Sequence, residues 1–549
     1  MKEEIVKEKF SKKINEKIVY VLLNIAKVIA LAIIGFLFIA AFTHTAYFYT
    51  DKIDYYHEGL YYSLDNVIAN ILLMIVTCII FYFLNSLLCR IKHKRIVVIL
   101  FFIIMIILGG CWNSFIKAPI KSDQLQVLND AKMFAENNYK PLDDYSYLYQ
   151  HPLQLGITFF ESLIIRIFKV NYENVFKAIN VISITIALFF LYKITNIKVD
   201  SHKEEYSSYT FLILMLSLLV IPFYTVVVYG NVVGFMFIII SIYFLVKYLN
   251  NNNLKNIFLS VIFAFISYLL KSNYVIMIIA MILAIIIDTI NKFKWKNLVY
   301  ISLMILVCLG SYPLLNICME VASGKKINDG IPMVTYIAMS INQKPISRNS
   351  GWYGEETTVE TIYHASAFNY QDTANVSKMI ISDRLKYFIN NPLIAIKFYQ
   401  DKICSTWIEP AFQTIWWAEP LEVYPFMTDE YKDYVNSDFY QNITVGNGHR
   451  ILIRYLDIIE NLIFITSFIS IVASIKSNDV DIRRSICLIA FIGGFLFHIL
   501  WETKCIYVIP FYLCILPYSS DGFDILFKRA DYFRRKGKID GNNKKIYER

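Results

Sequence analysis

The chain has 549 residues, of which 57% are hydrophobic, 16% aromatic and only 18% charged. Soluble domains carry about 45–50% apolar residues, so this composition, arranged in long apolar blocks, excludes an ordinary soluble protein. The formal net charge of +9 is concentrated beside those blocks, where the positive-inside rule accounts for it, and therefore does not indicate nucleic-acid binding.

Apolar blocks long enough to cross a membrane recur along the whole chain. A bilayer core of about 30 Å is crossed by about 20 helical residues. We therefore predict an all-α polytopic membrane protein with about 11–13 transmembrane helices. The predicted blocks are 18–43, 67–89, 95–116, 153–169, 173–194, 208–228, 231–248, 254–289, 297–316, 451–475, 484–500 and 505–519.

Basic segments predict the sidedness of these blocks. The loop "CRIKHKR" (89–95), the tail "FKRADYFRRKGK" (527–538) and the lysine-rich N-terminus are expected in the cytoplasm. The segments 117–152 and 317–450 are then extracytoplasmic loops of a cell-membrane protein. This leaves seven apolar blocks between 153 and 316, where the number of crossings must be even. Either the pair 254–270 and 273–289 forms one broken element, or another short block is re-entrant.

Five regions follow from this layout. They are a cytoplasmic tail with two accessory spans (1–94), a transmembrane core with a first outer loop (95–316), an extracytoplasmic domain (317–450), C-terminal spans (451–520) and a basic tail (521–549). The extracytoplasmic domain shows helical periodicity. Its residues Trp407, Trp416 and Trp417 are expected to rest on the membrane, because an indole ring is apolar while its N–H needs a partner.

The first outer loop contains an unusual run of carboxylates and aromatic residues, "SDQLQVLNDAKMFAENNYKPLDDYSYLYQHP" (122–152). Asp123 followed by Gln126 matches a capping box for a helix over 124–136. A catalytic role for this carboxylate, close to the end of a membrane span, is the alternative. The local pattern leaves both open, and the two roles can coexist.

Three motifs together resemble a family of membrane enzymes. They are the Asp123 segment with "YLYQHPLQLG" (147–156), "GWYG" (351–354) in the long outer loop, and a late "WETKCIYVIP" (501–510). This arrangement looks like the GT-C glycosyltransferase superfamily, which includes protein O-mannosyltransferases and the lipid A aminoarabinose transferase. In more detail, it resembles the glycosyltransferase-39-like membrane proteins common in Gram-positive bacteria. The double proline common in that family is absent, since Pro152 is followed by Leu153.

The resemblance implies a GT-C-like helical bundle and an inverting, mannosyltransferase-like transferase of class EC 2.4. Such an enzyme moves a sugar from a polyprenyl-phosphate donor to a cell-envelope acceptor, which is a glycopolymer, a glycolipid or a protein. Asp123 is then the general base that accepts the proton of the acceptor hydroxyl. Membrane lipids are the other expected partners, and no nucleic acid is expected.

A leaving phosphate requires cations, and several lysines and arginines are candidates. The predicted donor-phosphate ligands are Lys504, Arg348, Lys271 and Lys121. The predicted substrate-binding residues are Glu502, Asp143, Asp144, His151, Trp352 and Tyr353. For each of these the plain alternative is a solvated loop charge or a buried turn aromatic.

No cofactor is predicted. The nine cysteines include no C-x-x-C pair, which argues against a zinc site, although the superfamily also contains metal-requiring members, so a divalent metal is not excluded. The competing functions are a transporter, a lipid-linked glycan flippase and a polymerase of lipid-linked oligosaccharides. A secondary transporter is expected to show paired half-sequences, and none is evident here.

Overall fold

The computed structural model describes residues 2–48, 59–118, 120–196, 206–342, 349–353, 357–419, 429–444 and 446–547. The fold is mostly helical, as predicted. Within the described residues, nine helices are long and apolar enough to cross a membrane: α1 (Lys2–Thr43), α2 (Val67–Arg90), α3 (Lys94–Phe115), α7 (Tyr172–Thr195), α10 (Gly230–Asn251), α12 (Val275–Asn291), α13 (Trp295–Ser323), α20 (Asn447–Lys476) and α21 (Ile482–Leu500).

Fewer helices reach span length than the 11–13 predicted, because several apolar blocks form short or bent helices. A tenth span results if α8 (Tyr206–Ser217) and α9 (Val220–Phe223), with the 3-10 turn η3 (Tyr224–Val226), count as one element bent by 54°. Two other blocks form α11 (Leu254–Leu270) and α22 (Cys505–Leu513), the second followed by α23 (Leu516–Tyr547). The prediction of a polytopic helical membrane protein is confirmed.

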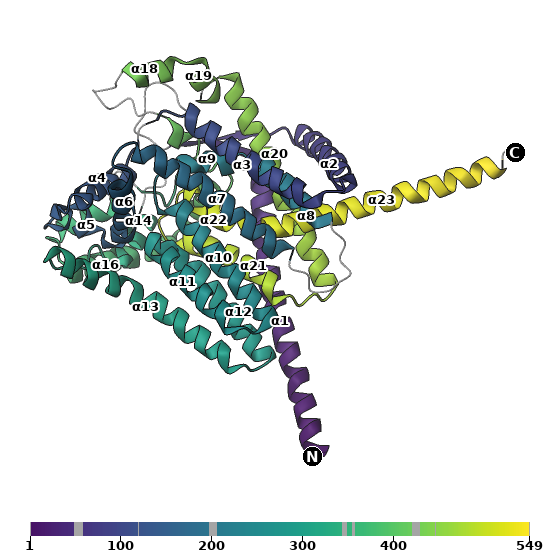
Figure 1. Cartoon of the computed structure of the whole chain (residues 1–549), viewed down its shortest axis with the longest axis horizontal. Helices are drawn as coiled ribbons and strands as arrows, with labels where there is room; N and C mark the ends of the chain where they lie inside the picture. The colour runs from purple at the N-terminus through teal and green to yellow at the C-terminus, as the bar shows by residue number, and fades with distance from the viewer. Residues whose placement is uncertain are drawn as a thin grey trace.

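The helices pack around α10. The apolar stretch of α10 is 67% buried, whereas that of α2 is 11% buried, so α2 lies at the edge of the bundle and faces lipid over most of its length. α10 packs against α7 and α11, and α12 packs against α13 and α21. Figure 1 shows these helices side by side, with the first residues of α1 and the last residues of α23 projecting from the bundle.

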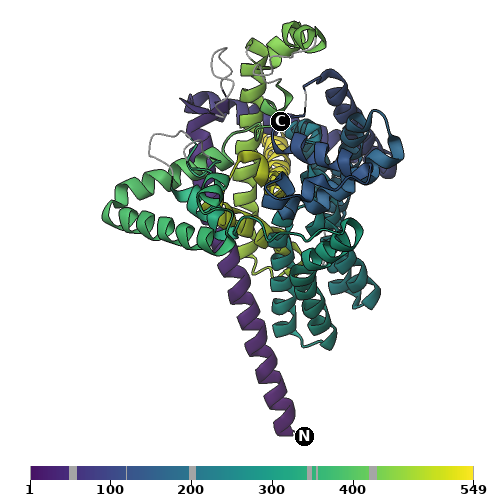
Figure 2. The same ribbon diagram turned by 90° about the vertical axis from the view of Figure 1, so that its left-hand side faces the viewer.

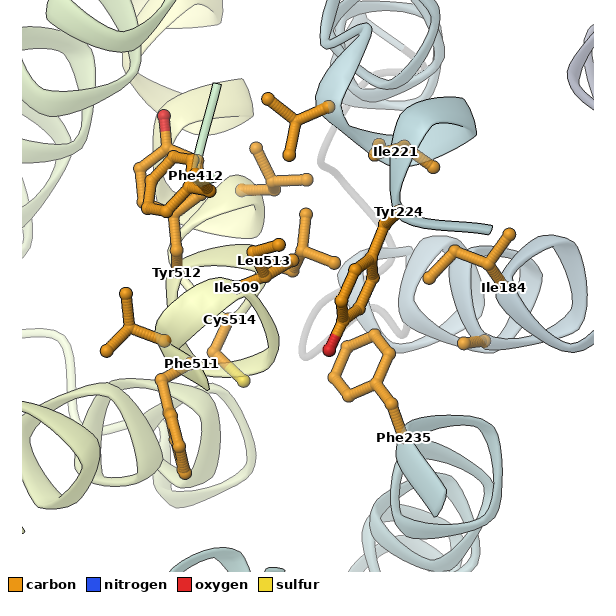
Figure 3. Close-up of a cluster of buried hydrophobic side chains, with 14 of the residues drawn as sticks. Ile184, Ile221, Tyr224, Phe235, Phe412, Ile509, Phe511, Tyr512, Leu513 and Cys514 are labelled. Carbon is orange, nitrogen blue, oxygen red and sulfur yellow. The ribbon is translucent and has the colours of Figure 1, made fainter. Parts of the chain in front are cut away.

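The core joins the two halves of the sequence. Figure 3 shows Tyr224 and Phe235 from the middle of the chain facing residues of the C-terminal helices across the buried cluster. On that far side, the ring of Tyr512 lies 4.8 Å from the ring of Phe412. The remaining labelled residues are Ile184, Ile221, Ile509, Phe511, Leu513 and Cys514. The C-terminal spans are therefore part of one bundle with the central helices.

The block 153–169 forms α6 (Leu155–Phe168), which is not among the nine helices of span length in the described residues. Its 14 residues extend about 21 Å at 1.5 Å per residue, which is less than a bilayer core. α6 packs along α4 (Asp123–Ala135). Arg166 donates to the Phe134 carbonyl at 2.6 Å and to Asn137 Oδ1 at 2.8 Å, so the end of α6 lies beside the end of α4. The pair 254–270 and 273–289, the first candidate for a broken element, instead forms α11 and α12, two helices joined by the 3-10 turn η4 (Ser272–Tyr274).

Three loop regions gather at one end of the bundle, which we call the loop face. It comprises the described parts of 117–152 and 317–419, with the turn 501–504. The amide of Ile331 donates to the Gln150 carbonyl at 2.9 Å, and the amide of Thr503 donates to the Gly351 carbonyl at 3.0 Å. The helices of this face are α4, α5 (Tyr147–Gln150), α14 (Met333–Ile341), α15 (Val359–Ala365), α16 (Tyr370–Asn390) and α17 (Pro392–Trp407).

Two of the three tryptophans expected at the membrane surface, Trp407 and Trp416, are instead inside the protein, and Trp417 is half-buried. Trp407 is 1% exposed and packs between Phe491 and Phe495 of α21, with ring centroids 5.5 and 5.7 Å away. Trp416 is buried beneath the Lys121 ammonium, whose nitrogen lies 3.8 Å from the ring centre. These aromatic residues belong to the seam between the loop domain and the bundle.

A small sheet departs from the all-α prediction. After α1, strand β1 (His44–Phe48) pairs antiparallel with β2 (Leu60–Leu64), with Ala46 opposite Tyr62. The Asn349 side chain accepts from the Leu60 amide at 3.0 Å, which joins this sheet to the long loop.

Candidate functional site

Asp123 occupies the first turn of α4, where a carboxylate is stabilised by the helix dipole. The predicted capping box is wrong. Ser122, with φ +56°, precedes the helix and makes no side-chain cap, and Gln126 Nε2 donates to Asp130 Oδ1 at 3.2 Å instead. The Asp123 side chain is exposed, and among the described residues no hydrogen bond or ion pair to it is found. Its carboxylate is therefore accessible to a ligand.

Lys271 lies in the break between α11 and α12. Its ammonium nitrogen is 4.2 Å from the centre of the Tyr229 ring and 5.7 Å from that of Tyr507. Burial lowers the pKa of Lys271 to about 8, and the nearby carboxylates of Asp123 and Glu502 oppose this shift. One cation and two carboxylates from distant parts of the sequence thus act on each other at the loop face.

Two glycines fix the break that carries Lys271. A Cβ on Gly156 would lie 2.0 Å from the Leu269 carbonyl oxygen, and a Cβ on Gly230 would lie 1.9 Å from that of Leu270. Any side chain at either position would force the end of α11 to move. The glycines allow α6 and α10 to contact the last turn of α11 directly, which sets the position of the lysine.

The turn 501–504 brings Glu502 and Lys504 to the same place. The hydrogen bond from Thr503 to Gly351 and a 3.1 Å bond between the hydroxyls of Thr406 and Thr503 hold this turn against the long loop. Burial raises the pKa of Glu502 to about 7, with Lys504 opposing the shift and Asp123 adding to it. Both residues are half-buried.

His151 belongs to a second group beside the first. Its Nε2 lies 3.2 Å from Glu360 Oε1, and its Nδ1 lies 3.1 Å from the Tyr336 hydroxyl. The Tyr353 hydroxyl donates to Glu360 Oε2 at 2.8 Å. Burial raises the pKa of Glu360, but the contacts with His151 outweigh it and lower the value to about 2. Glu360 is therefore a carboxylate at neutral pH.

Three tyrosines connect the two groups: Tyr229 is buried, and Tyr147 and Tyr336 are half-buried. Burial raises the pKa values of Tyr147, Tyr229 and Tyr336 well above the usual range, and the Asp123 charge adds to each shift. The hydroxyls consequently stay protonated and can donate hydrogen bonds. The Trp501 ring stacks on Tyr336 with centroids 5.7 Å apart, so the aromatic wall continues into the turn 501–504.

Some predicted residues lie elsewhere. Lys121 is buried and donates to the carbonyls of Trp416 and Glu419 at 2.7 and 2.8 Å, which gives it a structural environment. Asp143 pairs with Lys325, and Asp144 is exposed. Trp352 is 2% exposed, with its ring 6.0 Å from that of Phe48. Arg348 lies outside the described residues.

Sequence reasoning missed Tyr336, Glu360 and Lys402. Lys402 is fully buried in α17 and donates to the Ser340 hydroxyl at 2.8 Å; burial lowers its pKa to about 7, and the Glu502 charge opposes this. None of the three lies in a motif that the sequence marks. Within the described residues, no group of three or more His, Cys, Asp or Glu side chains is arranged to hold a metal ion.

Comparison with known proteins gives one match. Residues 150–314 match the family described as dolichyl-phosphate-mannose-protein mannosyltransferase. The match contains His151, Tyr229 and Lys271, whereas Asp123 and Glu502 lie outside it. No curated protein and no solved structure matches the chain. The similarity to this mannosyltransferase family therefore covers residues 150–314, which are less than half of the chain.

Proposed function

We propose that the chain is an inverting glycosyltransferase that moves a sugar from a polyprenyl-phosphate carrier to a hydroxyl acceptor at the loop face. The family match supports a polyprenyl-phosphate-mannose donor. The basic segments of the sequence support an extracytoplasmic loop face, and hence an acceptor in the cell envelope: a glycopolymer, a glycolipid or a protein.

One observation carries the proposal: the Asp123 carboxylate acts on Lys271 and Glu502 without being paired to either among the described residues. Charged groups that shift each other's pKa without forming an ion pair, near a membrane span, suit a ligand with both a phosphate and a hydroxyl. Lys271 is suited to the phosphate, and Asp123 to the proton.

The chemistry is a single displacement. The acceptor oxygen forms a bond to the anomeric carbon while its proton passes to the Asp123 carboxylate. The bond between that carbon and the phosphate oxygen breaks, and the electron pair leaves with the polyprenyl phosphate. The Lys271 ammonium stabilises the charge that develops on this phosphate, and Lys504, in the adjoining turn, is placed to assist. Attack from the face opposite the leaving group inverts the anomeric centre.

The test is sugar transfer by the purified chain in lipid nanodiscs, with polyprenyl-phosphate mannose and a panel of hydroxyl acceptors. Asp123→Asn is expected to reduce transfer about 10²–10⁴-fold, the usual contribution of a general base. Asp144→Asn is the matched control, because Asp144 is an exposed carboxylate of the same loop, and it is expected to retain transfer.

Asparagine is nearly isosteric with aspartate, so the Asp123→Asn protein is expected to unfold at the same temperature as the parent. Full transfer by this variant would show that Asp123 is not the general base. Absence of transfer by the parent chain with every polyprenyl-phosphate sugar would remove the proposed donor class.

A further inference from the structure

The loop face carries a long helical hairpin that has no role in the proposed sugar-transfer reaction. It consists of α16 and α17, joined at Asn391. The two helices pack through Phe388 and Phe398, whose ring centroids are 5.3 Å apart, and the Arg384 guanidinium lies 4.5 Å from the centre of the Phe388 ring. Figure 2 shows the hairpin as two green helices that project sideways from the bundle, across the direction of α1 rather than along it.

The root of the hairpin lies at membrane depth. Trp407, the last residue of α17, packs between Phe491 and Phe495 of α21. These phenylalanines come nine and five residues before Leu500, where this membrane-spanning helix ends. At 1.5 Å per residue they lie about 7–14 Å inside the end of the span. A hairpin that leaves the bundle sideways from this level runs beside the bilayer surface.

The tip of the hairpin is apolar and exposed. The side chains of Ile389, Leu393 and Ile396 are 77%, 80% and 62% exposed, although they flank a turn that could carry polar residues at no cost. An aliphatic side chain is stabilised when it leaves water, so three of them on one projecting tip indicate a surface that is covered in the native environment.

Cations border the apolar tip. Lys386 and Lys397 lie within one turn of it, and Lys378 lies two turns further along α16; all three are exposed. Lys386 also lies 3.4 Å from the exposed Asp383, so this lysine is partly neutralised while the other two are not paired to that carboxylate. Lysines that flank an apolar tip extend their ammonium groups to lipid phosphates while the aliphatic side chains enter the acyl boundary. The charge therefore complements an anionic membrane surface, and the depth of the root places that surface within reach.

We infer that the α16–α17 hairpin is a membrane-inserted arm, whose tip at residues 389–396 enters the bilayer on the loop side of the protein. Its partner is the phospholipid surface, bound through aliphatic insertion and lysine–phosphate contacts. The arm would fix the tilt and depth of the loop domain relative to the lipid. The inference depends on packing, exposure and charge in the hairpin, so it stands whether or not the chain transfers sugar.

The experiment places an environment-sensitive fluorescent amino acid at position 393 of the full chain, reconstituted in nanodiscs with anionic lipid. Position 144, an exposed aspartate of the loop 117–152 and outside the hairpin, is the matched control. At 393 the emission is expected to shift to the blue, to be quenched by spin label on the lipid chains and to resist aqueous iodide. At 144 the opposite pattern is expected.

A companion variant, Ile389→Ser with Leu393→Ser and Ile396→Ser, tests the same tip through a different readout. These side chains are exposed, so the variant is expected to fold. In nanodiscs, its hairpin amides are expected to exchange with deuterium faster than those of the parent chain. In a detergent-free polymer that leaves the tip without lipid contact, the exchange rates of variant and parent are expected to be equal. Quenching of position 393 by iodide instead of lipid spin label would overturn the inference. Protection that appears only when two labelled chains share a nanodisc would also overturn it, in favour of a second copy as the partner.

Discussion

The two ends of the helical bundle contain the same kinds of charged residue but arrange them differently. At the end opposite the loop face, Lys294 lies 2.9 Å from Asp288, and Arg483 lies 3.0 Å from Asp481. At the loop face, no ion pair among the described residues joins Lys271 to either carboxylate that acts on it. Closed pairs contribute to the fold, whereas charges held apart leave room for a ligand between them.

The largest effect expected from this contrast concerns Lys271. Lys271→Met removes the charge that the proposed phosphate contact needs, and a hydrogen bond to a charged group contributes about 1.5–3 kcal/mol. Transfer, measured as kcat/KM for the polyprenyl-phosphate donor, is therefore expected to fall about 10–100-fold. Lys294→Met at the opposite end is the control and is expected to leave kcat/KM unchanged. Equal losses in both variants would erase the distinction between the two ends.

The pH dependence sharpens the same contrast. The pKa of Lys271 is lowered to about 8 by burial, so the ammonium is charged below that pH and neutral above it. The value of kcat/KM is expected to decline by about tenfold per unit once the pH exceeds 8. Lys271→Arg retains its charge at these pH values and should flatten the decline.

Glu502 offers a competing cause for that decline, because its pKa is raised to about 7 by burial and the carboxylate becomes charged above that pH. A negative charge there would repel the donor phosphate. If the decline begins near pH 7 and Glu502→Gln abolishes it while Lys271→Arg does not, the assignment to Lys271 is wrong.

A smaller effect is expected from opening a closed pair at the opposite end. Arg484 pairs with Asp521 and lies 3.8 Å from Asp481, with its side chain about one-fifth exposed. Arg484→Ala is expected to lower the free energy of unfolding by about 1–2 kcal/mol, between the exposed and the buried limits. Thermal unfolding in nanodiscs measures this, and kcat/KM is expected to stay at the parental value. A variant with parental stability and reduced transfer would contradict the structural role.

The smallest effect is expected at Asp143, whose pair with Lys325 is exposed at the edge of the loop face. Asp143→Asn is expected to change stability by less than about 1 kcal/mol and to leave transfer intact. Thermal unfolding and sugar transfer are measured for Asp143→Asn and, for comparison, for Asp144→Asn. A raised KM for the acceptor would instead support the predicted role of Asp143 in acceptor binding.

The bundle could be predicted from sequence because apolar length and basic flanks are local signals. The exceptions are informative. The block 153–169 is apolar enough for a span, yet it forms α6, and only its packing against α4 reveals this. Trp407 has the composition of an interface residue, but Phe491 and Phe495 enclose it. Contacts between segments that are distant in sequence determine both the packing of α6 and the position of Trp407, so neither can be predicted from one segment alone.

The candidate site shows the same division. Asp123, Lys271 and Glu502 were found because each stands beside a break or end of an apolar block. Tyr336 and Glu360 were missed because their sequence surroundings are ordinary. They reach the site through contacts with His151, which is 185 positions from Tyr336 along the chain. Patterns in sequence locate the ends of helices, but they do not show which ends meet.

The glycines beside Lys271 have a consequence for variation in this chain. Gly156 and Gly230 each touch the final carbonyl groups of α11 at a distance that leaves no space for one more carbon atom. A methyl group there would alter no charge and remove no hydrogen bond, yet it would shift the helix end from which the lysine extends. The position of the Lys271 ammonium group thus depends on the absence of a side chain at both Gly156 and Gly230.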